Sequence, residues 1–137
     1  MSLFKVFDIA GSGMSAQMLR LNTVSSNLAN AQTYSTTEEG AYRSRQPVFQ
    51  TVLNDFNNED GSKVRVTQIV ESDATVPMNY MPNHPLANEQ GYVFGSNVNA
   101  VEEMTNMMSA SRSYQNNTEM MNTSKELLLR TLQLGRG

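Results

Sequence analysis

The residues of this chain that could do chemistry are few, and they lie far apart in the sequence. The one histidine, His84, stands in the segment Pro82-Asn83-His84-Pro85. A protein metal site usually needs three or four His, Cys, Asp or Glu ligands, and the chain contains no cysteine. We therefore interpret His84 as a turn residue, and we expect neither a metal site nor a cofactor.

Two acidic pairs, Glu38-Glu39 and Glu102-Glu103, are the other candidates for catalysis. Neighbouring side chains on a helix point about 100° apart, so a pair within one helix cannot flank one scissile bond. A hydrolase would need two carboxylates from separate parts of the chain, so a small cell-wall hydrolase is kept as an alternative function. The segment Gly11-Ser12-Gly13 is too short for a phosphate-binding loop and lacks its lysine. We expect a protein that is not an enzyme.

Composition excludes further classes of function. The ten basic residues are scattered, and the formal net charge is −3. A nucleic-acid-binding protein normally gathers its positive charge on one face, so that class is disfavoured. No segment approaches the roughly 20 apolar residues that span a bilayer, and the first residues do not resemble a cleaved secretory signal. The chain contains ten methionines, and its polar residues are mostly Asn, Gln, Ser and Thr. This composition suits a protein that contacts several other proteins.

The N-terminal part of the chain has the periodicity of an amphipathic helix. Apolar residues recur every seven positions at Phe7, Met14, Leu21 and Leu28. The segment Gly11-Ser12-Gly13 interrupts this pattern and allows two interpretations. It is either a local weak point, because glycine disfavours a helix, or a bare surface that another helix can approach closely.

A second helix is predicted from near Asn97 to Gln133, where Gly135 follows as a stop signal. Its apolar row recurs every seven residues, and we expect a companion row one turn away. The apolar row contains Ala100, Met107, Tyr114, Met121 and Leu128, and the expected companion row contains Met104, Ser111, Thr118, Lys125 and Leu132.

The middle of the chain, residues 33–96, has a different pattern. Asp60-Gly61 is a turn signal, and Val64, Val66 and Ile69 indicate a strand with a bulge. Three prolines at 77, 82 and 85 are expected to keep residues 76–86 extended. We predict a mainly α fold in which residues 1–32 and 97–137 form one discontinuous helical core, packed as a coiled-coil-like hairpin, with residues 33–96 as loop and small β-rich insertion.

Short motifs in these segments resemble a known family. Asn27-Leu28-Ala29-Asn30 closes the first helix, and Gly40-Ala41-Tyr42-Arg43 follows after a spacer. Further along come Pro82-Asn83-His84-Pro85 and Gly91-Tyr92. This set is similar to the signatures of the axial proteins of the bacterial flagellum, and the spacer and the length of the chain are most like those of its short proximal-rod members. Ser96 stands where that pattern has proline, a departure at the start of the second helix.

The resemblance implies a structural subunit of the flagellar basal-body rod, a periplasmic shaft that transmits torque around an export channel. Such subunits are exported through the flagellar type III apparatus without a cleaved signal peptide, and their terminal helices form an inner helical tube. The implied partners are further copies of the chain, the rod proteins FlgB, FlgF and FlgG, the base adaptor FliE and the export apparatus. The alternative is a free-standing helical-hairpin adaptor or a coiled-coil protein associated with type III secretion.

Polar residues on the second helix are candidates for contacts between subunits. Between Thr105 and Thr118 the only charged residue is Arg112, whereas a solvated helix favours pairs of opposite charge. Asn and Ser can hydrogen-bond a neighbour without the desolvation cost of a charge. We therefore predict that the polar residues of this stretch lie at subunit contacts, although they would also suit an open polar face. They are Asn106, Ser109, Ser113 and Asn116.

Overall fold

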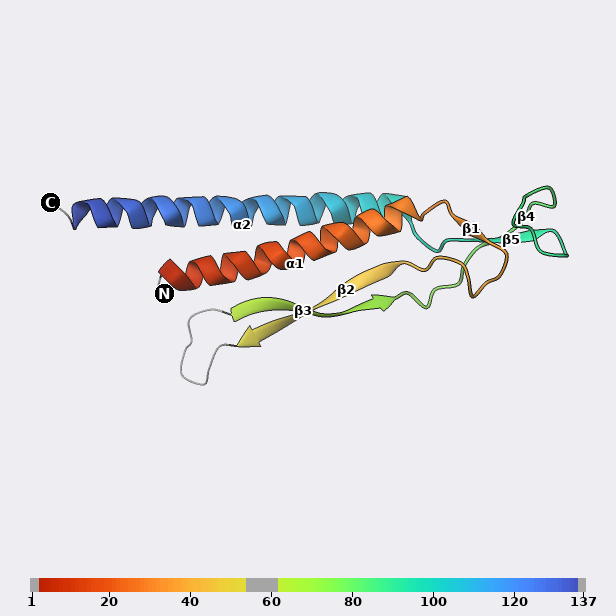
Figure 1. The fold of residues 1–137 in the computed structure, drawn as a ribbon, viewed down its shortest axis with the longest axis horizontal. Coiled ribbons are helices and arrows are strands. Elements are labelled where there is room, and N and C mark those ends of the chain that lie inside the picture. Colours follow the sequence, from red (N-terminus) through yellow and green to blue (C-terminus); the bar gives the residue numbers. More distant parts are fainter. Residues whose placement is uncertain (1–2, 54–61, 136–137) are drawn as a thin grey trace.

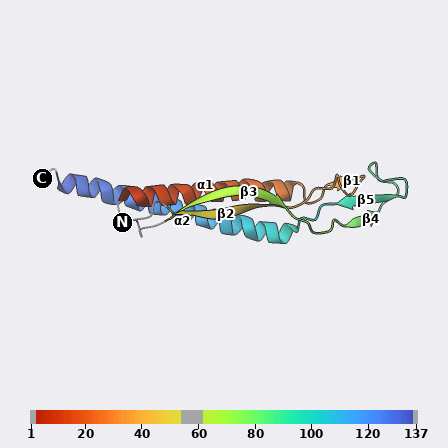
Figure 2. The ribbon, with the colours of Figure 1, turned by 90° about the horizontal axis from the view of Figure 1, so that it is seen from below.

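The structure is elongated and consists of two long helices, a β-hairpin and a small end sheet (Figure 1). This computed structural model describes residues 3–53 and 62–135. The helices lie side by side and antiparallel, and the hairpin runs along the other side of α1, while β1, β4 and β5 lie beyond the helix ends (Figures 1 and 2). The elements are α1 (Leu3–Ala29), β1 (Tyr34–Ser35), β2 (Arg45–Leu53), β3 (Ser62–Glu71), β4 (Met78–Tyr80), β5 (Tyr92–Gly95) and α2 (Ala100–Leu134).

This arrangement confirms the predicted fold class, a mainly α protein with a small β-rich insertion. The side chain of Asn99 caps the start of α2, where its oxygen accepts hydrogen bonds from the backbone N–H groups of Val101 and Glu102 at 3.1 and 3.3 Å. Gly135 is the C-cap of α2, as predicted, and its backbone N–H makes the last helical hydrogen bond, to the carbonyl of Thr131 at 3.0 Å. Within the described residues, neither helix has a stretch that is both long and apolar enough to cross a membrane.

The structure corrects one part of the sequence interpretation, namely which residues of α2 pack against α1. The apolar row is half-buried from Met107 to Leu128, whereas its first residue, Ala100, is exposed. The expected companion row is wrong at three of its five positions, because Met104, Lys125 and Leu132 are exposed, while Ser111 and Thr118 are half-buried. The actual companion row begins one residue earlier and is small or polar, so hydrophobicity did not reveal it. It consists of Glu103, Ala110, Asn117 and Ser124.

The two glycines of the segment Gly11-Ser12-Gly13 differ in what surrounds them. A Cβ atom built on Gly13 would lie 2.8 Å from the Nδ2 atom of Asn117, closer than real Cβ contacts allow. A Cβ atom on Gly11 would meet nothing within 4 Å. Each of the two interpretations of the glycine segment therefore fits one residue. Gly13 leaves room for the end of the Asn117 side chain of α2, and Gly11 is a conformational weak point without a packing role.

We expect the substitution Gly11→Ala to raise the free energy of unfolding by about 1 kcal/mol, because alanine favours a helix over glycine by about that amount and the new methyl group meets free space. Gly13→Ala is the matched control, since its methyl group must displace the Asn117 side chain and should cancel the gain. Urea unfolding monitored by circular dichroism measures both. Equal stabilisation by both substitutions would show that the Asn117 side chain moves aside without cost.

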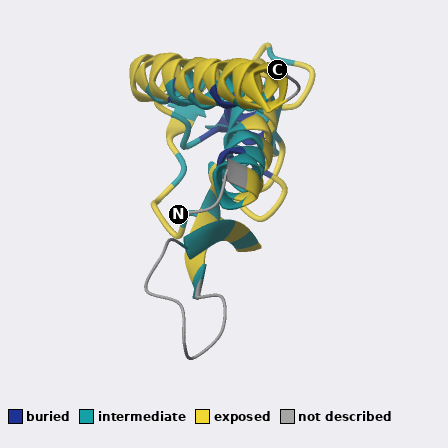
Figure 3. Cartoon of the chain, turned by 90° about the vertical axis from the view of Figure 1, so that its left-hand side faces the viewer, coloured by how far each residue is buried: buried dark blue, intermediate teal, exposed yellow. Residues whose placement is uncertain are grey.

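The β2–β3 hairpin contains the bulge that the sequence indicated. The antiparallel register shifts between Val48 and Phe49, so that Val48 is opposite Gln68 while Phe49 is opposite Val66. The turn expected at Asp60-Gly61 lies outside the described residues. The helix α1 lies between α2 and this hairpin and is mostly half-buried, whereas α2 is exposed over most of its surface (Figure 3).

The end sheet has the strand order β1-β5-β4, and its centre is Val93, which is fully buried. The expectation of extended chain from 76 to 86 is correct only as far as β4. Beyond it the chain turns twice, because the backbone N–H of His84 donates to the carbonyl of Met81 and that of Ala87 donates to the carbonyl of His84, both at 3.0 Å. Prolines 82 and 85 therefore belong to turns, where their fixed φ angle is equally suitable.

Candidate functional site at a buried polar junction

The most highly connected polar side chain of the structure is Asn27, near the end of α1, which is 0% exposed. Its Oδ1 atom accepts hydrogen bonds from the Tyr42 hydroxyl and from the backbone N–H of Arg45, both at 3.0 Å. Its Nδ2 atom donates to the Arg45 carbonyl at 2.8 Å and to the Ser44 hydroxyl at 3.4 Å. The Asn27 amide thus bonds both backbone groups of Arg45, as a neighbouring strand would, and holds the start of β2 against α1.

A second asparagine, Asn97, connects the same segment to the start of α2. Its Oδ1 atom accepts a hydrogen bond from the backbone N–H of Ser44 at 2.6 Å. Its Nδ2 atom donates to the Ala74 carbonyl at 2.9 Å, and the Arg43 guanidinium donates to the same carbonyl at 3.1 Å. The junction of Asn27, Tyr42, Ser44 and Asn97 therefore joins the end of α1, both ends of the hairpin and the chain before α2.

Asparagine suits both positions because its side chain offers an acceptor and two donors on one planar group. An aspartate would lose the donors, and an aliphatic residue would leave part-buried backbone groups without their partners in the protein, at a cost of up to about 1–3 kcal/mol for each group. The junction thus fixes an orientation between segments that are far apart in the sequence. This is a structural role, and the contacts include no arrangement of a nucleophile beside a base.

A buried carboxylate lies beside the junction on α2. Glu103 is 2% exposed, and its Oε1 atom accepts a hydrogen bond from the Gln46 side chain of β2 at 3.1 Å. Its Oε2 atom has no hydrogen-bond partner among the described residues. Over residues 3–53 and 62–135, no three His, Asp or Glu side chains lie close enough together to hold a metal ion. Through its bond to Gln46, Glu103 connects α2 to the base of the hairpin.

The remaining motif residues shape the end sheet and its loops. Gly91 has a φ angle of +82°, and a Cβ atom there would lie 2.9 Å from the Tyr80 ring. The rings of Tyr80 and Tyr92 pack edge to face at 5.1 Å, as do those of Tyr34 and His84 at 5.4 Å. His84 is therefore part of an aromatic contact in a turn between the exposed Pro82 and Pro85.

Two further motif residues lie near the end of α1 and in the loop after β1. The Nδ2 atom of Asn30 donates to the carbonyl of Ser26 at 2.8 Å, and this bond closes the last turn of α1. A Cβ atom on Gly40 would lie 2.6 Å from the hydroxyl oxygen of Ser35, so this loop position favours glycine. Both residues therefore shape the chain that leads from α1 to Tyr42.

The residues predicted for the helix seam are all half-buried. On α1 they are Phe7, Met14, Leu21 and Leu28, and on α2 they are Met107, Tyr114, Met121 and Leu128. The Thr118 hydroxyl and the Met14 sulfur are 4.0 Å apart across the helix pair.

The residues predicted for subunit contacts differ from one another in their surroundings. Asn106 has a partner in its own chain, since its Oδ1 atom accepts a hydrogen bond from Arg20 at 3.0 Å. Ser113 is half-buried, and Ser109 and Asn116 are exposed. Ser109 and Asn116 are therefore the two with side chains free to meet a neighbour.

Sequence reasoning did not identify Ser44, Asn97, Glu103 or Ala110 as structural residues, and it noted Asn27 only as part of a motif. Polar and small residues give no periodic hydrophobic signal, so their burial was not visible. An asparagine just before a predicted helix, as at Asn97 and Asn99, is the one local signal that a cap lies there.

Comparison with known proteins gives two family matches, one at each end of the chain. Residues 7–34 match the family described as flagella basal body rod protein. Residues 89–134 match the family described as flagellar basal body rod FlgEFG protein C-terminal. The two matched regions contain most of α1 and α2, together with the Asn27 and Asn97 side chains of the junction.

Individual relatives are similar over almost the whole chain. The flagellar basal-body rod protein FlgC of Yersinia enterocolitica is 47% identical over 135 residues, which cover 98% of this chain and 99% of the relative. The protein of the same name from Salmonella typhimurium has the same identity and coverage. That of Borreliella burgdorferi is 34% identical over 152 residues and the full length of both chains.

Proposed function

Because the chain belongs to the FlgC family of flagellar basal-body rod proteins, we propose that it is a load-bearing part of the periplasmic drive shaft, where it transmits torque around the export channel. The chain is a structural rod subunit of the flagellar basal body. The observation that supports a mechanical role is the polar junction, which ties both terminal helices to the central segment. Torque then passes between subunits through packed helices, and the chain does this without catalysis.

We propose that the helical core and the central segment have different places in the rod. Residues 1–32 and 97–137 form the discontinuous helical core that contributes to the inner tube, and residues 33–96 form the insertion that surrounds it. The exposed side chains of α2 support this role, since Met104 and Met108 are large, apolar and exposed on a face that no described part of the chain covers. Such a face gains stability by contact with other subunits.

The partners that we propose are further copies of the chain, the rod proteins FlgB, FlgF and FlgG, the base adaptor FliE and the type III export apparatus that delivers the subunits. The basis is family membership together with an outer face of α2 that is rich in methionine, whose flexible side chains adapt to neighbours that are not identical. Pairwise cross-linking in isolated basal bodies tests these partners.

Contacts between subunits are proposed to include Ser109 and Asn116, with Ser113 at the edge and Asn106 shared with Arg20 of the same chain. Ser109→Lys and Asn116→Lys should each leave the free subunit soluble and helical, because both positions are exposed. In the rod the buried charge should lower incorporation at least about tenfold, since desolvation of an unpaired charge costs several kcal/mol. Incorporation is measured as the amount of the chain in purified basal bodies.

The matched controls are Ser109→Ala and Asn116→Ala, which leave the contact uncharged and should assemble nearly normally. Circular dichroism of each purified variant establishes that the subunit still folds. Normal amounts of both lysine variants in basal bodies would show that these positions face open solvent. The role in the rod itself would be contradicted if the unaltered chain were absent from purified basal bodies.

A further inference from the structure

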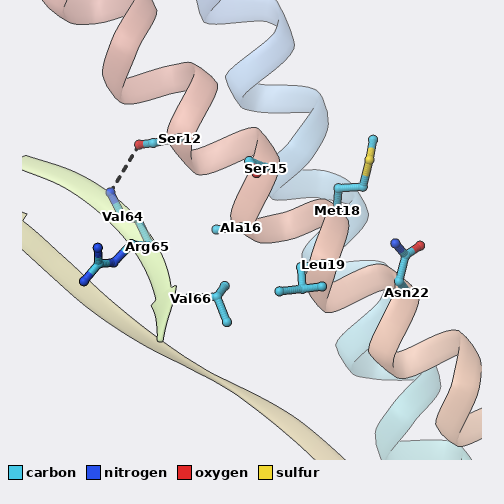
Figure 4. Close-up of a pocket in the computed structure, with 9 residues that line it drawn as sticks. All are labelled: Ser12, Ser15, Ala16, Met18, Leu19, Asn22, Val64, Arg65 and Val66. Atoms are coloured by element: carbon cyan, nitrogen blue, oxygen red, sulfur yellow. Dashed lines mark hydrogen bonds between the residues drawn. The ribbon is translucent and has the colours of Figure 1, made fainter. Parts of the chain in front are cut away.

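The groove between α1 and β3 has a lining that does not select one kind of partner. It has a volume of about 540 Å³, and the backbone N–H of Val64 donates to the Ser12 hydroxyl at 3.2 Å between its two walls (Figure 4). Its lining mixes small, polar and apolar side chains with one charged residue, Arg65. The outer edge of β4 is more selective, because both its backbone groups and the charge around it restrict what can bind.

The strand β4 lies at the outside of the end sheet, whose order is β1-β5-β4 (Figure 1). The carbonyl of Pro77 accepts a hydrogen bond from the backbone N–H of Gly95 at 2.8 Å, so it faces β5. Backbone groups alternate in direction along an antiparallel strand, so those of Met78 and Tyr80 face away from the sheet. Among the described residues, none forms a hydrogen bond to these outward groups. They can therefore pair with the backbone of an added strand.

Apolar side chains flank this open edge. Met78 is 57% exposed and Tyr80 is 65% exposed, and both lie on the same face of the sheet because they are two residues apart. A strand added beside β4 would cover them with its own alternate side chains. Pro82 follows soon after and has no backbone N–H, so the open edge is short.

The end sheet and its loops form an acidic part of the chain. Residues 33–42 and 73–96 contain four acidic residues and none of the ten lysines and arginines. The formal net charge of −3 for the whole chain minus −4 for these two ranges leaves +1 for the remainder. All four acidic side chains are exposed, so the region attracts positive charge. They are Glu38, Glu39, Asp73 and Glu89.

A second copy of the chain offers no matching segment. Two end sheets placed edge to edge would bring their acidic residues together. The extended segment with basic residues is the β2–β3 hairpin, but two of its cations are already paired within the chain. Arg45 lies 2.9 Å from Glu71, and Lys63 lies 2.9 Å from Asp8. The hairpin of a second copy would therefore bring one further cation, Arg65.

We propose that the open edge of β4 binds an extended, basic segment of a different protein of the basal body, which adds to the end sheet as a fourth strand. This inference rests on the proposed function, which gives the chain several protein neighbours. Hydrogen bonds to the outward backbone groups of Met78 and Tyr80 align the segment. The exposed carboxylates around the sheet select a segment with positive charge.

Site-specific photocross-linking in assembled basal bodies tests this proposal. A photoreactive benzoylphenylalanine replaces Met78 in one variant and Tyr80 in another. The control has it in place of Thr36, which is exposed next to β1 at the opposite edge of the sheet. Mass spectrometry then locates each adduct. We expect the adducts from the two β4 positions to lie about two residues apart in one segment of another protein, with more Lys and Arg than Asp and Glu, and the Thr36 variant not to capture it.

The substitution Met78→Pro removes an outward N–H and leaves the hydrogen bonds between β4 and β5 in place. The adduct yield from the Tyr80 position should fall at least about tenfold, because a hydrogen bond is lost and the proline ring blocks the edge. Met78→Ala is the matched control, since it keeps the N–H, and its yield should change less than about twofold. Equal yields in the two variants would overturn the proposal.

The double variant Asp73→Asn with Glu89→Gln leaves the backbone unaltered and tests the charge. Both side chains are exposed, so the sheet should keep its structure. The adduct yield from the Tyr80 position should fall at least about threefold, because two attractive charges are lost. An unchanged yield would overturn the proposal.

The identity of the captured segment is equally decisive. Adducts to another copy of the chain, adducts to a segment without an excess of Lys and Arg, or no protein adduct from either β4 position would each overturn the proposal. In these cases the presence of the chain in purified basal bodies would leave the proposed function intact. Absence of the chain from basal bodies would contradict both.

Discussion

Replacing Asn27 with alanine is expected to lower the free energy of unfolding by about 3 kcal/mol. The substitution leaves the backbone N–H and the carbonyl of Arg45 without partners inside the protein and removes one acceptor from the Tyr42 hydroxyl. It also opens a small cavity at a fully buried site. Chemical denaturation of the purified subunit, monitored by circular dichroism, measures the loss.

Asn30→Ala is the matched control, because Asn30 belongs to the same motif but donates only to the Ser26 carbonyl within its own helix. Its loss should be about 1 kcal/mol or less, the value of an ordinary hydrogen bond. A double-mutant cycle with Tyr42→Phe separates the contact between the two side chains from the other losses. If Asn27→Ala and Asn30→Ala cost the same, the junction does not hold the helix to the hairpin as we describe.

The substitution Ala110→Glu is expected to disrupt the helix pair of the free subunit altogether. Ala110 is 0% exposed in the row of α2 that faces α1, and a glutamate there adds volume and an unpaired charge to a closely packed seam. Overpacking costs about 1–3 kcal/mol and burial of an unpaired charge costs more, so the sum approaches the entire stability of a small domain. Loss of helical ellipticity and of a cooperative thermal transition would show the disruption.

Gln115→Glu places the same side chain on the exposed side of the same helix and should leave both signals almost unchanged. A cooperative transition in Ala110→Glu within a few degrees of that of Gln115→Glu would mean that the seam does not pass through Ala110. The comparison also discriminates between the two candidate rows. Lys125 belongs to the row expected from the sequence and is exposed, so Lys125→Glu should behave like Gln115→Glu.

The sequence by itself determined the parts of this protein that depend on periodicity and local signals. Two helices at the ends of the chain, the row of Met107, Tyr114, Met121 and Leu128, the stop at Gly135 and the bulged strand followed from apolar spacing and from glycine and proline positions. The motifs at Asn27 and Tyr42 also indicated the flagellar rod family. These features can be predicted from the sequence because each depends on residues that are close to one another along the chain.

Only the tertiary structure decided how these parts meet. The row of Glu103, Ala110, Asn117 and Ser124 contains no strongly apolar side chain, so its burial follows from the close approach of α1 and from no local pattern. The bonds of Asn27 to Arg45 and of Asn97 to Ser44 join residues that are distant in the sequence. An asparagine side chain can satisfy many partners equally well, and the partner that it receives is set by the packing of the whole chain.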